Sequence, residues 1–518
     1  ANQFLTLSQS DAAPSTPLPV FTQTPVFQSV KLPNGISFLH RESPFVDFDQ
    51  ERLLFNMISN EGPCACTADI NRDGREDLFI GGAKGQPGAL FVQNPNGTFK
   101  PLPVPSLLDD QASEDSGCAF FDANGDGFPD LYVASGSNES SNASLEFLDR
   151  LYLNQGGKGF IKSPQILPSP IGSFSTAAVC PADFDQDGDI DLFIGGRVSP
   201  GLYGVPQNGF LLQNDGQGQF RDATKQLAPA LQKSGMITSA AWADFNGDGT
   251  LDLLIGGDWM PLQLFVQKQG RFAEASKEAG FNLSNGWYHT LRIADINLDG
   301  LPDIIAGNHG LNSRFKASES EPISLYINDF DQNGTVEQIL TRYDQGKELP
   351  LVLRNDLVKQ LPSLKKRFLR FENYVNQSVQ DIFPAPQYPN TLILRAYHLE
   401  TAVWLNLGKG TFKRQPLPAL AQLAPVYAIA VQDFDHDGQP DILLGGNQFR
   451  AKPETGVYRS SYGLLLRGDG KGNFQPLPPA ASGLWIDGQI RCLLPFHINN
   501  QPMVLIAKND AYPELIHY

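Results

Sequence analysis

The sequence lacks any apolar run long enough to cross a membrane. None of its stretches reaches the ~18–20 consecutive apolar residues that a membrane-spanning helix needs. Basic residues are also scarce, with 39 Lys and Arg against 56 Asp and Glu and a formal charge of −17. This charge argues against nucleic acid as a partner, because the phosphate backbone is itself negative. The sequence contains no Gly-x-Ser-x-Gly elbow, phosphate-binding loop, dinucleotide fingerprint or His-Glu-x-x-His motif. The usual motifs of hydrolases, nucleotide-binding enzymes and zinc proteases are therefore missing.

Cysteine is rare, with five residues in 518, and no Cys-x-x-Cys pair suggests zinc. Cys66, Cys118 and Cys180 each precede an acidic loop by three or four residues, where other repeats carry alanine. We interpret them as small core residues. A disulfide, such as Cys64 or Cys118 with Cys492, stays open because spacing does not determine pairing.

Acidic loops are what the sequence has in abundance. Asp183 begins a nine-residue loop with carboxylates at positions 1, 3, 5 and 9 and glycine at position 6, where a sharp turn favours a residue without Cβ. The pattern occurs seven times, with Asn replacing some acids and Glu337 replacing one. The candidate ligands are Asp69, Asn71, Asp73 and Asp77; Asp122, Asn124, Asp126 and Asp130; Asp183, Asp185, Asp187 and Asp191; Asp244, Asn246, Asp248 and Asp252; Asp295, Asn297, Asp299 and Asp303; Asp329, Asp331, Asn333 and Glu337; and Asp433, Asp435, Asp437 and Asp441.

Such loops predict calcium sites. Ca²⁺ takes six to eight oxygen ligands from carboxylates and carbonyls in flexible geometry, and position 7 would add its backbone carbonyl. Empty, the clustered carboxylates would repel one another. An EF-hand would require a Glu at position 12 and flanking helices, but here position 9 leads directly into strand-like runs such as 192–196, 253–257 and 442–446. We therefore expect about seven Ca²⁺ sites on a β scaffold.

The spacing of the loops predicts a β-propeller. Loop starts at 69, 122, 183, 244 and 295 are 51–61 residues apart, which suits one four-stranded blade per repeat. We expect an all-β, seven-bladed propeller, with eight blades as the alternative. The tail, residues 485–518, carries three strand-like runs and no acidic loop, and an N-terminal strand would complete it as the closing blade. We expect strands at 27–30 and 36–39 for this region.

The chain divides into three expected parts. Residues 1–20 are rich in Ser, Pro and Gln and predict an extended arm or linker, and residues 21–518 form the calcium-binding propeller. Residues 308–390 are an insertion in the fifth blade, which would close with 391–415; an extra blade within the insertion is the alternative. Apolar residues recur there at helical spacing between Leu357 and Tyr374, which predicts one or two helices broken at Pro362. The chain begins at Ala1 with neither Met nor a signal peptide, so we expect a mature form or a fragment of a longer protein.

The repeats resemble FG-GAP/VCBS repeats, which are known from the integrin α propeller, where calcium occupies Asp-x-Asp/Asn-x-Asp-Gly-x-x-Asp loops. The resemblance covers about residues 64–480. A nearer similarity is to bacterial surface proteins of the cartilage-acidic-protein type (ASPIC/UnbV-associated), carried by residues 35–40, 44–48 and 62–63 and by the Asp329 loop. It implies an extracellular or cell-surface protein of bacteria, calcium-loaded, with adhesion or assembly roles. The C-terminal domain of that family is missing.

Four aromatic or imidazole side chains are candidates for a channel site. His289 and His309 flank the Asp295 loop, and Trp259 and Trp287 lie in loop-like segments. Each also fits an ordinary packing role. Separately, Lys365, Lys366, Arg367 and Arg370 form the one dense basic cluster, either a solvated helix face or a docking face for an acidic partner.

Together these features favour a non-enzymatic, calcium-stabilised extracellular propeller that acts as a protein-binding, adhesion or assembly module. Its partner would be a protein or glycan at the cell surface. A carbohydrate-binding, lectin-like propeller is the alternative, and a polysaccharide-active enzyme is a third class, disfavoured because no nucleophile–base or acid–base constellation is evident.

Overall fold

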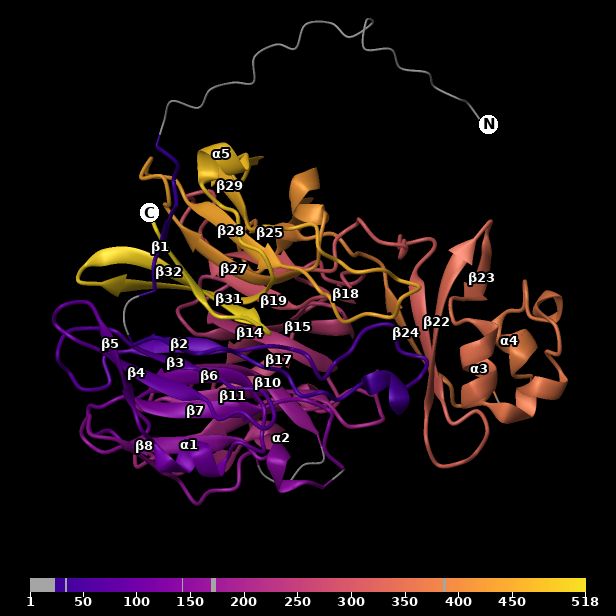
Figure 1. The fold of residues 1–518 in the computed structure, drawn as a ribbon, viewed down its shortest axis with the longest axis horizontal. Helices are drawn as coiled ribbons and strands as arrows, with labels where there is room; N and C mark the ends of the chain where they lie inside the picture. The colour runs from indigo at the N-terminus through magenta and orange to yellow at the C-terminus, as the bar shows by residue number, and fades with distance from the viewer. Residues whose placement is uncertain (1–23, 33–34, 142, 169–173, 385–387) are drawn as a thin grey trace, which may run out of the picture.

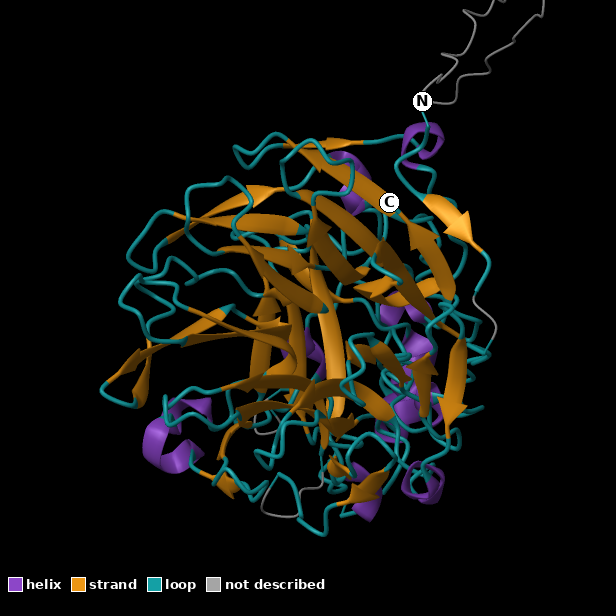
Figure 2. Ribbon diagram, turned by 90° about the vertical axis from the view of Figure 1, so that its left-hand side faces the viewer, coloured by secondary structure: helices purple, strands orange, loops and turns teal. Residues whose placement is uncertain are grey.

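Antiparallel sheets, all but one of them four-stranded, make up most of the regular secondary structure of the described residues. The computed structural model describes residues 24–32, 35–141, 143–168, 174–384 and 388–518, so the expected arm at 1–20 lies outside the described residues. Figure 1 shows the strands following one another along the chain, and Figure 2 shows how little helix interrupts them. Among the described residues, no helix is long and apolar enough to cross a membrane.

Seven of the eight sheets form a ring, and we number them as blades in chain order. Blade 1 is β2–β5 (Ala65–Ala68, Asp77–Ile80, Ala89–Gln93, Phe99–Leu102), and blade 2 is β6–β9 (Asp115–Phe121, Asp130–Ser135, Arg150–Asn154, Phe160–Lys162). Blade 3 is β10–β13 (Ser175–Ala182, Asp191–Val198, Gly209–Gln213, Arg221–Asp222). Blade 4 is β14–β17 (Met236–Ala243, Asp252–Met260, Gln263–Lys268, Arg271–Glu274), and the short strand β18 (Gly286–Trp287) also pairs with β15. Blades 5 and 6 are β19, β20, β25 and β26 (Thr290–Ala294, Asp303–Gly307, Ala402–Asn406, Phe412–Pro416) and β27–β30 (Val426–Gln432, Asp441–Gly446, Leu464–Gly468, Phe474–Pro476).

Blade 7 closes the ring with both ends of the chain. It consists of β31 (Gln489–Ile498), β32 (Gln501–Asn509), β33 (Glu514–His517) and the N-terminal β1 (Gln28–Val30). The first strand of every blade contacts that of the next, from β2 through β6, β10, β14, β19 and β27 to β31, which contacts β2 again. The predicted all-β propeller is confirmed, and this closed sequence of contacts favours seven blades. The strand expected at 36–39 is wrong: Ile36 and Phe38 are buried beside blade 7 but pair with no described strand.

The eighth sheet belongs to the insertion and lies outside the ring. It contains β21 (Ile323–Asn328), β22 (Glu337–Asp344), β23 (Lys347–Pro350) and β24 (Leu392–Ala396), in the order β23-β22-β21-β24. It stands to one side of the blades (Figure 1), and β24 contacts β15 and β18 of blade 4. The insertion is thus a sheet with helices rather than a helical excursion, and the Asp329 loop joins two of its strands. Residues 392–396, assigned to blade 5 from the sequence, pair instead with Ile323–Ile327 of β21, because a strand of this composition fits either sheet.

Helices are short and peripheral. They are α1 (Pro105–Asp109), α2 (Thr224–Leu227), α3 (Arg354–Gln360), α4 (Val379–Ile382) and α5 (Pro479–Ser482), with 3-10 turns at Asp47–Asp49, Leu145–Phe147, Pro229–Leu231, Pro362–Lys366, Phe371–Asn373 and Ala419–Gln422. The break expected at Pro362 falls where α3 ends, since proline cannot continue the helix. Leu357, Leu361 and Phe368 are buried, but Phe371 is 60% exposed, so the apolar stripe ends earlier than its spacing predicts.

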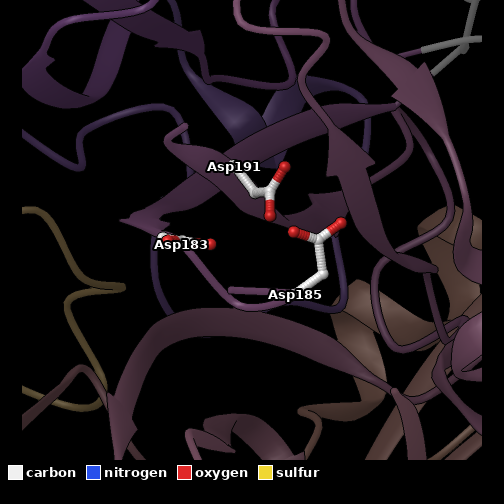
Figure 3. Close-up of side chains that lie close together, drawn as sticks. All are labelled: Asp183, Asp185 and Asp191. Atoms are coloured by element: carbon white, nitrogen blue, oxygen red, sulfur yellow. The ribbon is translucent and has the colours of Figure 1, made fainter. Parts of the chain in front are cut away.

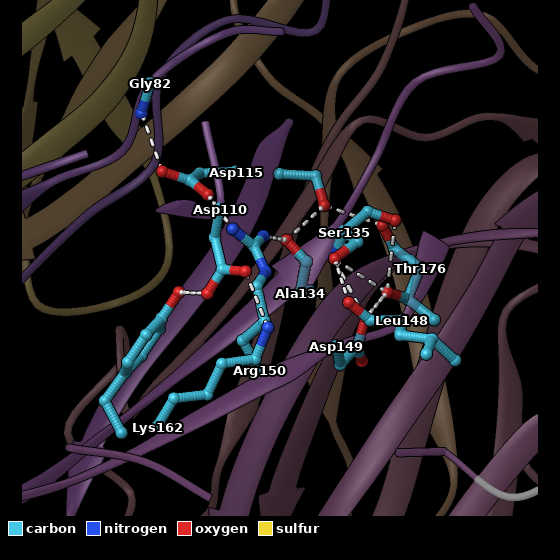
Figure 4. A network of polar contacts seen from close by, with 12 residues as sticks. Gly82, Asp110, Asp115, Ala134, Ser135, Leu148, Asp149, Arg150, Lys162 and Thr176 are labelled. Atoms are coloured by element: carbon cyan, nitrogen blue, oxygen red, sulfur yellow. Dashed lines mark hydrogen bonds and ion pairs between the residues drawn. The ribbon is translucent and has the colours of Figure 1, made fainter. Parts of the chain in front are cut away.

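Buried polar contacts connect successive blades. The Arg150 guanidinium of blade 2 pairs with Asp115 at 2.8 Å, with both side chains almost fully buried, and the other oxygen of Asp115 accepts the N–H of Gly82 in blade 1. Asp149 accepts hydrogen bonds from the Ser135 N–H and from the Thr176 hydroxyl of blade 3. Figure 4 shows this network. Removing one member would leave a buried charge or acceptor without its partner.

The closing blade supplies a test of ring closure. Phe27, 1% exposed, immediately precedes β1 and contacts the rings of Phe434 in blade 6 and Tyr518 after β33. We expect Phe27→Ala to destabilise the protein by about 3–5 kcal/mol, the usual cost of a buried Phe truncation. Urea unfolding with calcium present measures this. The same truncation at exposed Phe371 is the control and should stay within about 0.5 kcal/mol; equal effects of the two would contradict the closure role of Phe27.

Candidate metal centres

The seven acidic loops share one backbone geometry. Position 6 is glycine with φ between +84° and +99° in every loop, and position 4 is also left-handed, even where it is Leu298 or His436. The carboxylate at position 1 accepts the N–H groups of positions 5 and 6, as Asp69 does from Asp73 at 2.9 Å and Gly74 at 2.7 Å. The same two bonds recur from Asp122, Asp183, Asp244, Asp295, Asp329 and Asp433. The first aspartate therefore shapes each loop.

The acid at position 9 is buried and links the loop to its blade. Asp77 accepts the N–H of Ile70 in its loop at 3.2 Å and that of Gln93 on the third strand at 2.8 Å. Asp130, Asp252, Asp303 and Asp441 make the same pair of bonds. Burial raises the pKa of Asp191 and of Glu337 to about 7, with neighbouring carboxylates adding to the rise. A nearby cation would offset this unfavourable burial of charge.

Three loops bring acidic oxygens from positions 1, 3 and 9 within 4.8 Å of one another and could hold a metal ion: Asp183, Asp185 and Asp191; Asp329, Asp331 and Glu337; and Asp433, Asp435 and Asp441. Figure 3 shows the first set turned toward a common space. The other four loops have Asn at position 3, whose amide oxygen is a suitable ligand for a hard cation.

A second observation, the hydrogen bonding of the loop oxygens, also indicates that these loops suit a hard cation. One oxygen each of Asp185, Asp191, Asn246 and Asp331 is buried without a hydrogen-bond partner. Buried polar atoms are normally satisfied, so several such oxygens at one kind of loop indicate a missing positive partner. All ligands are oxygens, which suits Ca²⁺ rather than a metal that prefers sulfur or nitrogen.

The sequence analysis missed a set of amide side chains that join each loop to the next blade. Asn154, at the end of the third strand of blade 2, donates to the carbonyl of Ile70, the second residue of the loop in blade 1, at 2.8 Å. Blades 3, 4 and 5 each make the equivalent bond to the acidic loop of the preceding blade. The amide donors and carbonyl acceptors are Asn214 to Ala123, Gln267 to Phe184 and Asn406 to Phe245. The signal was present, since these residues follow the apolar third strand in the repeats, but a single Asn or Gln does not reveal its partner.

The structure brings the four candidate channel residues together. Trp259 and Trp287 pack with ring centroids 5.0 Å apart, Trp287 contacts His309 at 5.0 Å, and all of these residues and His289 line one central cavity. Burial lowers the pKa of both histidines to about 3, so they are neutral. The same cavity contains residues that the sequence did not single out, notably Arg197, Asp258 and Arg491.

The five cysteines are all free and half-buried. The Cys118 thiol of β6 hydrogen bonds with Cys64 and Cys66 of blade 1, and burial raises the pKa of Cys180 to about 12 and of Cys492 to about 11. These thiols are therefore uncharged and poorly nucleophilic at neutral pH.

Comparisons with known proteins agree with the repeat pattern. The chain contains FG-GAP-like repeats, matched at residues 69–133, 122–194, 202–255 and 244–306. It is similar to Cartilage acidic protein 1, with 28% identity to the Xenopus tropicalis protein and 29% to the Mus musculus protein over 205 residues, 38% of this chain. The matched part is 29% of the length of each of these relatives.

Solved structures give a more distant likeness. "BBS1N in complex with ARL6DN" covers 89% of this chain and 94% of that one, with a TM-score of 0.39 and 10% identity. The "exotype rhamnogalacturonan lyase YesX" covers 88% of this chain and 71% of that one, with a TM-score of 0.39 and 11% identity. Neither likeness carries an argument about function.

The amide contacts between blades are testable at Asn214, which is 7% exposed and donates to the carbonyls of Ala123 and Ile190. We expect Asn214→Leu, similar in shape, to cost about 1–3 kcal/mol because two buried carbonyls lose a donor. Urea unfolding in saturating calcium measures the change. Asn282→Leu at an exposed site is the matched control; a loss at Asn214 no larger than at Asn282 would show that the contact adds nothing.

Proposed function

We propose that this chain is a calcium-stabilised extracellular propeller, without catalytic activity, that binds an acidic protein partner through its insertion and so serves adhesion or assembly. One observation carries the proposal: a basic and apolar surface exposed on the insertion of an otherwise acidic chain. We call residues 365–371 the docking segment. The proposal covers about seven Ca²⁺ sites, one at each acidic loop.

Some side chains of the docking segment are buried against the insertion, and others are exposed to solvent. Leu361 and Phe368 are buried in the insertion core, whereas Leu369 and Phe371 are 72% and 60% exposed. Arg367 donates to the carbonyls of Asp381 and Ile382, so its role is to fix the segment. Lys365 and Lys366 are exposed, and the Arg370 side chain is 79% exposed, with only a weak surface pair to Glu372.

This mixture is typical of a protein-binding surface. Aromatic and arginine side chains, here Phe371 and Arg370, are enriched at protein interfaces. Leu369 and Phe371 expose apolar surface on either side of Arg370. Because the chain carries a formal charge of −17, the local positive charge would favour an acidic partner at this segment over contacts elsewhere.

The extracellular location and the absence of catalysis have separate support. The first is supported by the similarity to proteins named Cartilage acidic protein 1, and the second by the missing catalytic motifs together with the FG-GAP-like repeats. A carbohydrate-binding role is the second candidate, because Trp259 and Trp287 line a central cavity.

Calcium removal is expected to lower the melting temperature substantially. An ion that binds only the native state stabilises it by mass action, about 2.7 kcal/mol per site at 100 times its Kd. Calorimetry with and without excess EDTA measures the shift, and elemental analysis of the calcium-loaded protein should give about seven ions, one for each loop.

A single-loop variant sharpens this test. Asp185→Ala removes one oxygen without a protein partner and one that accepts a hydrogen bond from Gln213, and should lose one ion with a smaller decrease in melting temperature than EDTA causes. Asp215→Ala, an exposed aspartate outside the loops, should keep every ion. A melting curve indifferent to EDTA, or equal ion counts in both variants, would refute the calcium proposal.

Charge reversal tests the docking segment. We expect Lys365→Glu/Lys366→Glu/Arg370→Glu to lose at least tenfold in affinity for the partner, because like charges replace complementary ones, as coupling energies of about 1.5 kcal/mol or more at close pairs imply. Partners are first isolated with the calcium-loaded wild-type chain, and their affinities for each variant are then measured by surface plasmon resonance.

The matched control reverses three exposed lysines of blades 2 and 3, Lys158, Lys225 and Lys233. Both triple variants should retain the wild-type melting temperature. Undiminished binding by the docking-segment variant, or an equal loss in the control, would exclude the docking segment as the interface.

A further inference from the structure

A cavity of about 270 Å³ lies at the centre of the ring, and every blade contributes to its wall. The contributing residues are Ala65, Ser116, Ala177, Thr238, His289, Tyr427 and Arg491, in the order of blades 1 to 7. The segment 53–63 and the insertion residues Phe315, Leu325 and Leu340 complete the lining. The volume is just below the ~300–1,000 Å³ of pockets for drug-sized ligands and suits a single small ring.

β-Bulges aim these residues at the cavity. Ser116, Ala177, Thr238, Tyr427 and Arg491 are each skipped in the pairing of the first strand with the second strand of their blade. A bulge leaves one residue unpaired and redirects its side chain. At the bulge positions, blades 2 to 4 contribute small residues and blades 6 and 7 contribute Tyr427 and Arg491, so the cavity is wider beside the first strands of blades 2 to 4.

Large side chains of blades 5 to 7 form a stack of three. The His289 and Tyr427 rings are parallel within 13°, with centroids 4.0 Å apart, and the Arg491 guanidinium lies 4.0 Å from the Tyr427 centroid. Arg491 donates to the carbonyl of Asn447 at 2.9 Å, which fixes its plane. His289 and Arg491 therefore cover the two faces of the Tyr427 ring, and the guanidinium is the group of this stack that can bind a ligand.

Residues of the cavity wall carry buried polar atoms without partners. The donors are Nη1 of Arg197, Nε of Arg491 and Nε1 of Trp287, and the acceptors are the amide oxygens of Asn56, Asn60 and Gln448. The Nε2 atoms of His289 and His309 donate or accept according to the tautomer. Arg197, Trp287 and His309 are all more than nine-tenths buried. Buried polar groups normally have partners, so this combination of donors and acceptors matches a ligand rich in hydroxyl and carboxylate oxygens.

The charged side chains of the cavity wall favour a ligand that carries one carboxylate. Arg197 is balanced by Glu61 and Asp258, each at 2.8 Å. Arg491 forms no ion pair with any carboxylate of the described residues and depends on backbone and amide oxygens. Glu42, Glu61 and Asp510 attract Arg491 from beyond ion-pair distance. Burial of a guanidinium without a direct ion pair is costly, and a ligand carboxylate would supply a charge-assisted hydrogen bond.

We propose that the central cavity binds one acidic sugar residue of the hexuronate class, with its carboxylate on Arg491 and its ring against Trp287. This site is separate from the docking segment and from the acidic loops. A neutral hexose could hydrogen bond through its hydroxyl groups but would leave Arg491 without a direct ion pair. We therefore expect the uronate to bind more tightly.

Titration calorimetry of the calcium-loaded full chain with galacturonate and glucuronate, and with galactose and glucose, tests the site. We expect binding of at least one uronate, with neutral hexoses weaker by about tenfold or more because the charged hydrogen bond is lost. No binding of either uronate at millimolar concentration, or equal binding of neutral hexoses, would overturn the proposal.

Two variants locate the binding. Arg491→Gln removes the charge and should weaken uronate binding by about tenfold or more while sparing hexose binding. Ala177→Phe fills the wider side of the cavity without removing any polar partner and should abolish both. Arg459→Gln, at a half-exposed arginine paired with Asp487 outside the cavity, is the matched control and should bind as wild type. Uronate binding unchanged in Arg491→Gln and in a folded Ala177→Phe would refute the cavity as the site.

Discussion

Burial of a carboxylate at the ninth position of each acidic loop is the constraint on which this structure depends. Asp77 lies at 0% exposure and joins a loop, a second strand and a third strand through two backbone hydrogen bonds. A position-9 aspartate is buried in each of blades 1 to 6, so each of these blades places a carboxylate where water is excluded. Burial of charge is unfavourable alone, and the oxygen-lined loop beside each carboxylate is the place where a cation would relieve it.

Local patterns in the sequence were sufficient to predict the loops and the blades. The 1-3-5-9 spacing, the glycine at position 6 and the following apolar strand lie within fifteen residues. The sequence of a single repeat is therefore enough to predict its loop and the strand after it. The insertion was harder to interpret because its strands look like those of a blade. Residues 392–396 have the composition of a blade strand, and their partner β21 lies about 70 residues away. Only long-range pairing, which spacing does not encode, distinguishes the two assignments.

The central cavity was partly visible in the sequence. Trp259, Trp287, His289 and His309 could be selected by residue type, but nothing in the sequence indicated that they share one space. Arg491 and Tyr427 gave no signal, because their direction depends on a one-residue bulge in the first strand. A bulge reverses which face a side chain occupies, and alternation of apolar and polar residues does not reveal it when both faces of the strand are enclosed.

The side-chain amide hydrogen bonds between a third strand and the acidic loop of another blade all run the same way round the ring. In each case a later blade reaches back to the loop of the blade before it, as Asn154 reaches Ile70 and Asn406 reaches Phe245. At the corresponding place in blade 6 stands Gly468, which has no side chain to reach back to blade 5. Blade 5 is also where the insertion enters. The series of amide bonds is thus interrupted between blades 5 and 6, where other bonds cross instead, from Arg292 to the carbonyl of Ile429 and from Gln415 to that of Gly472.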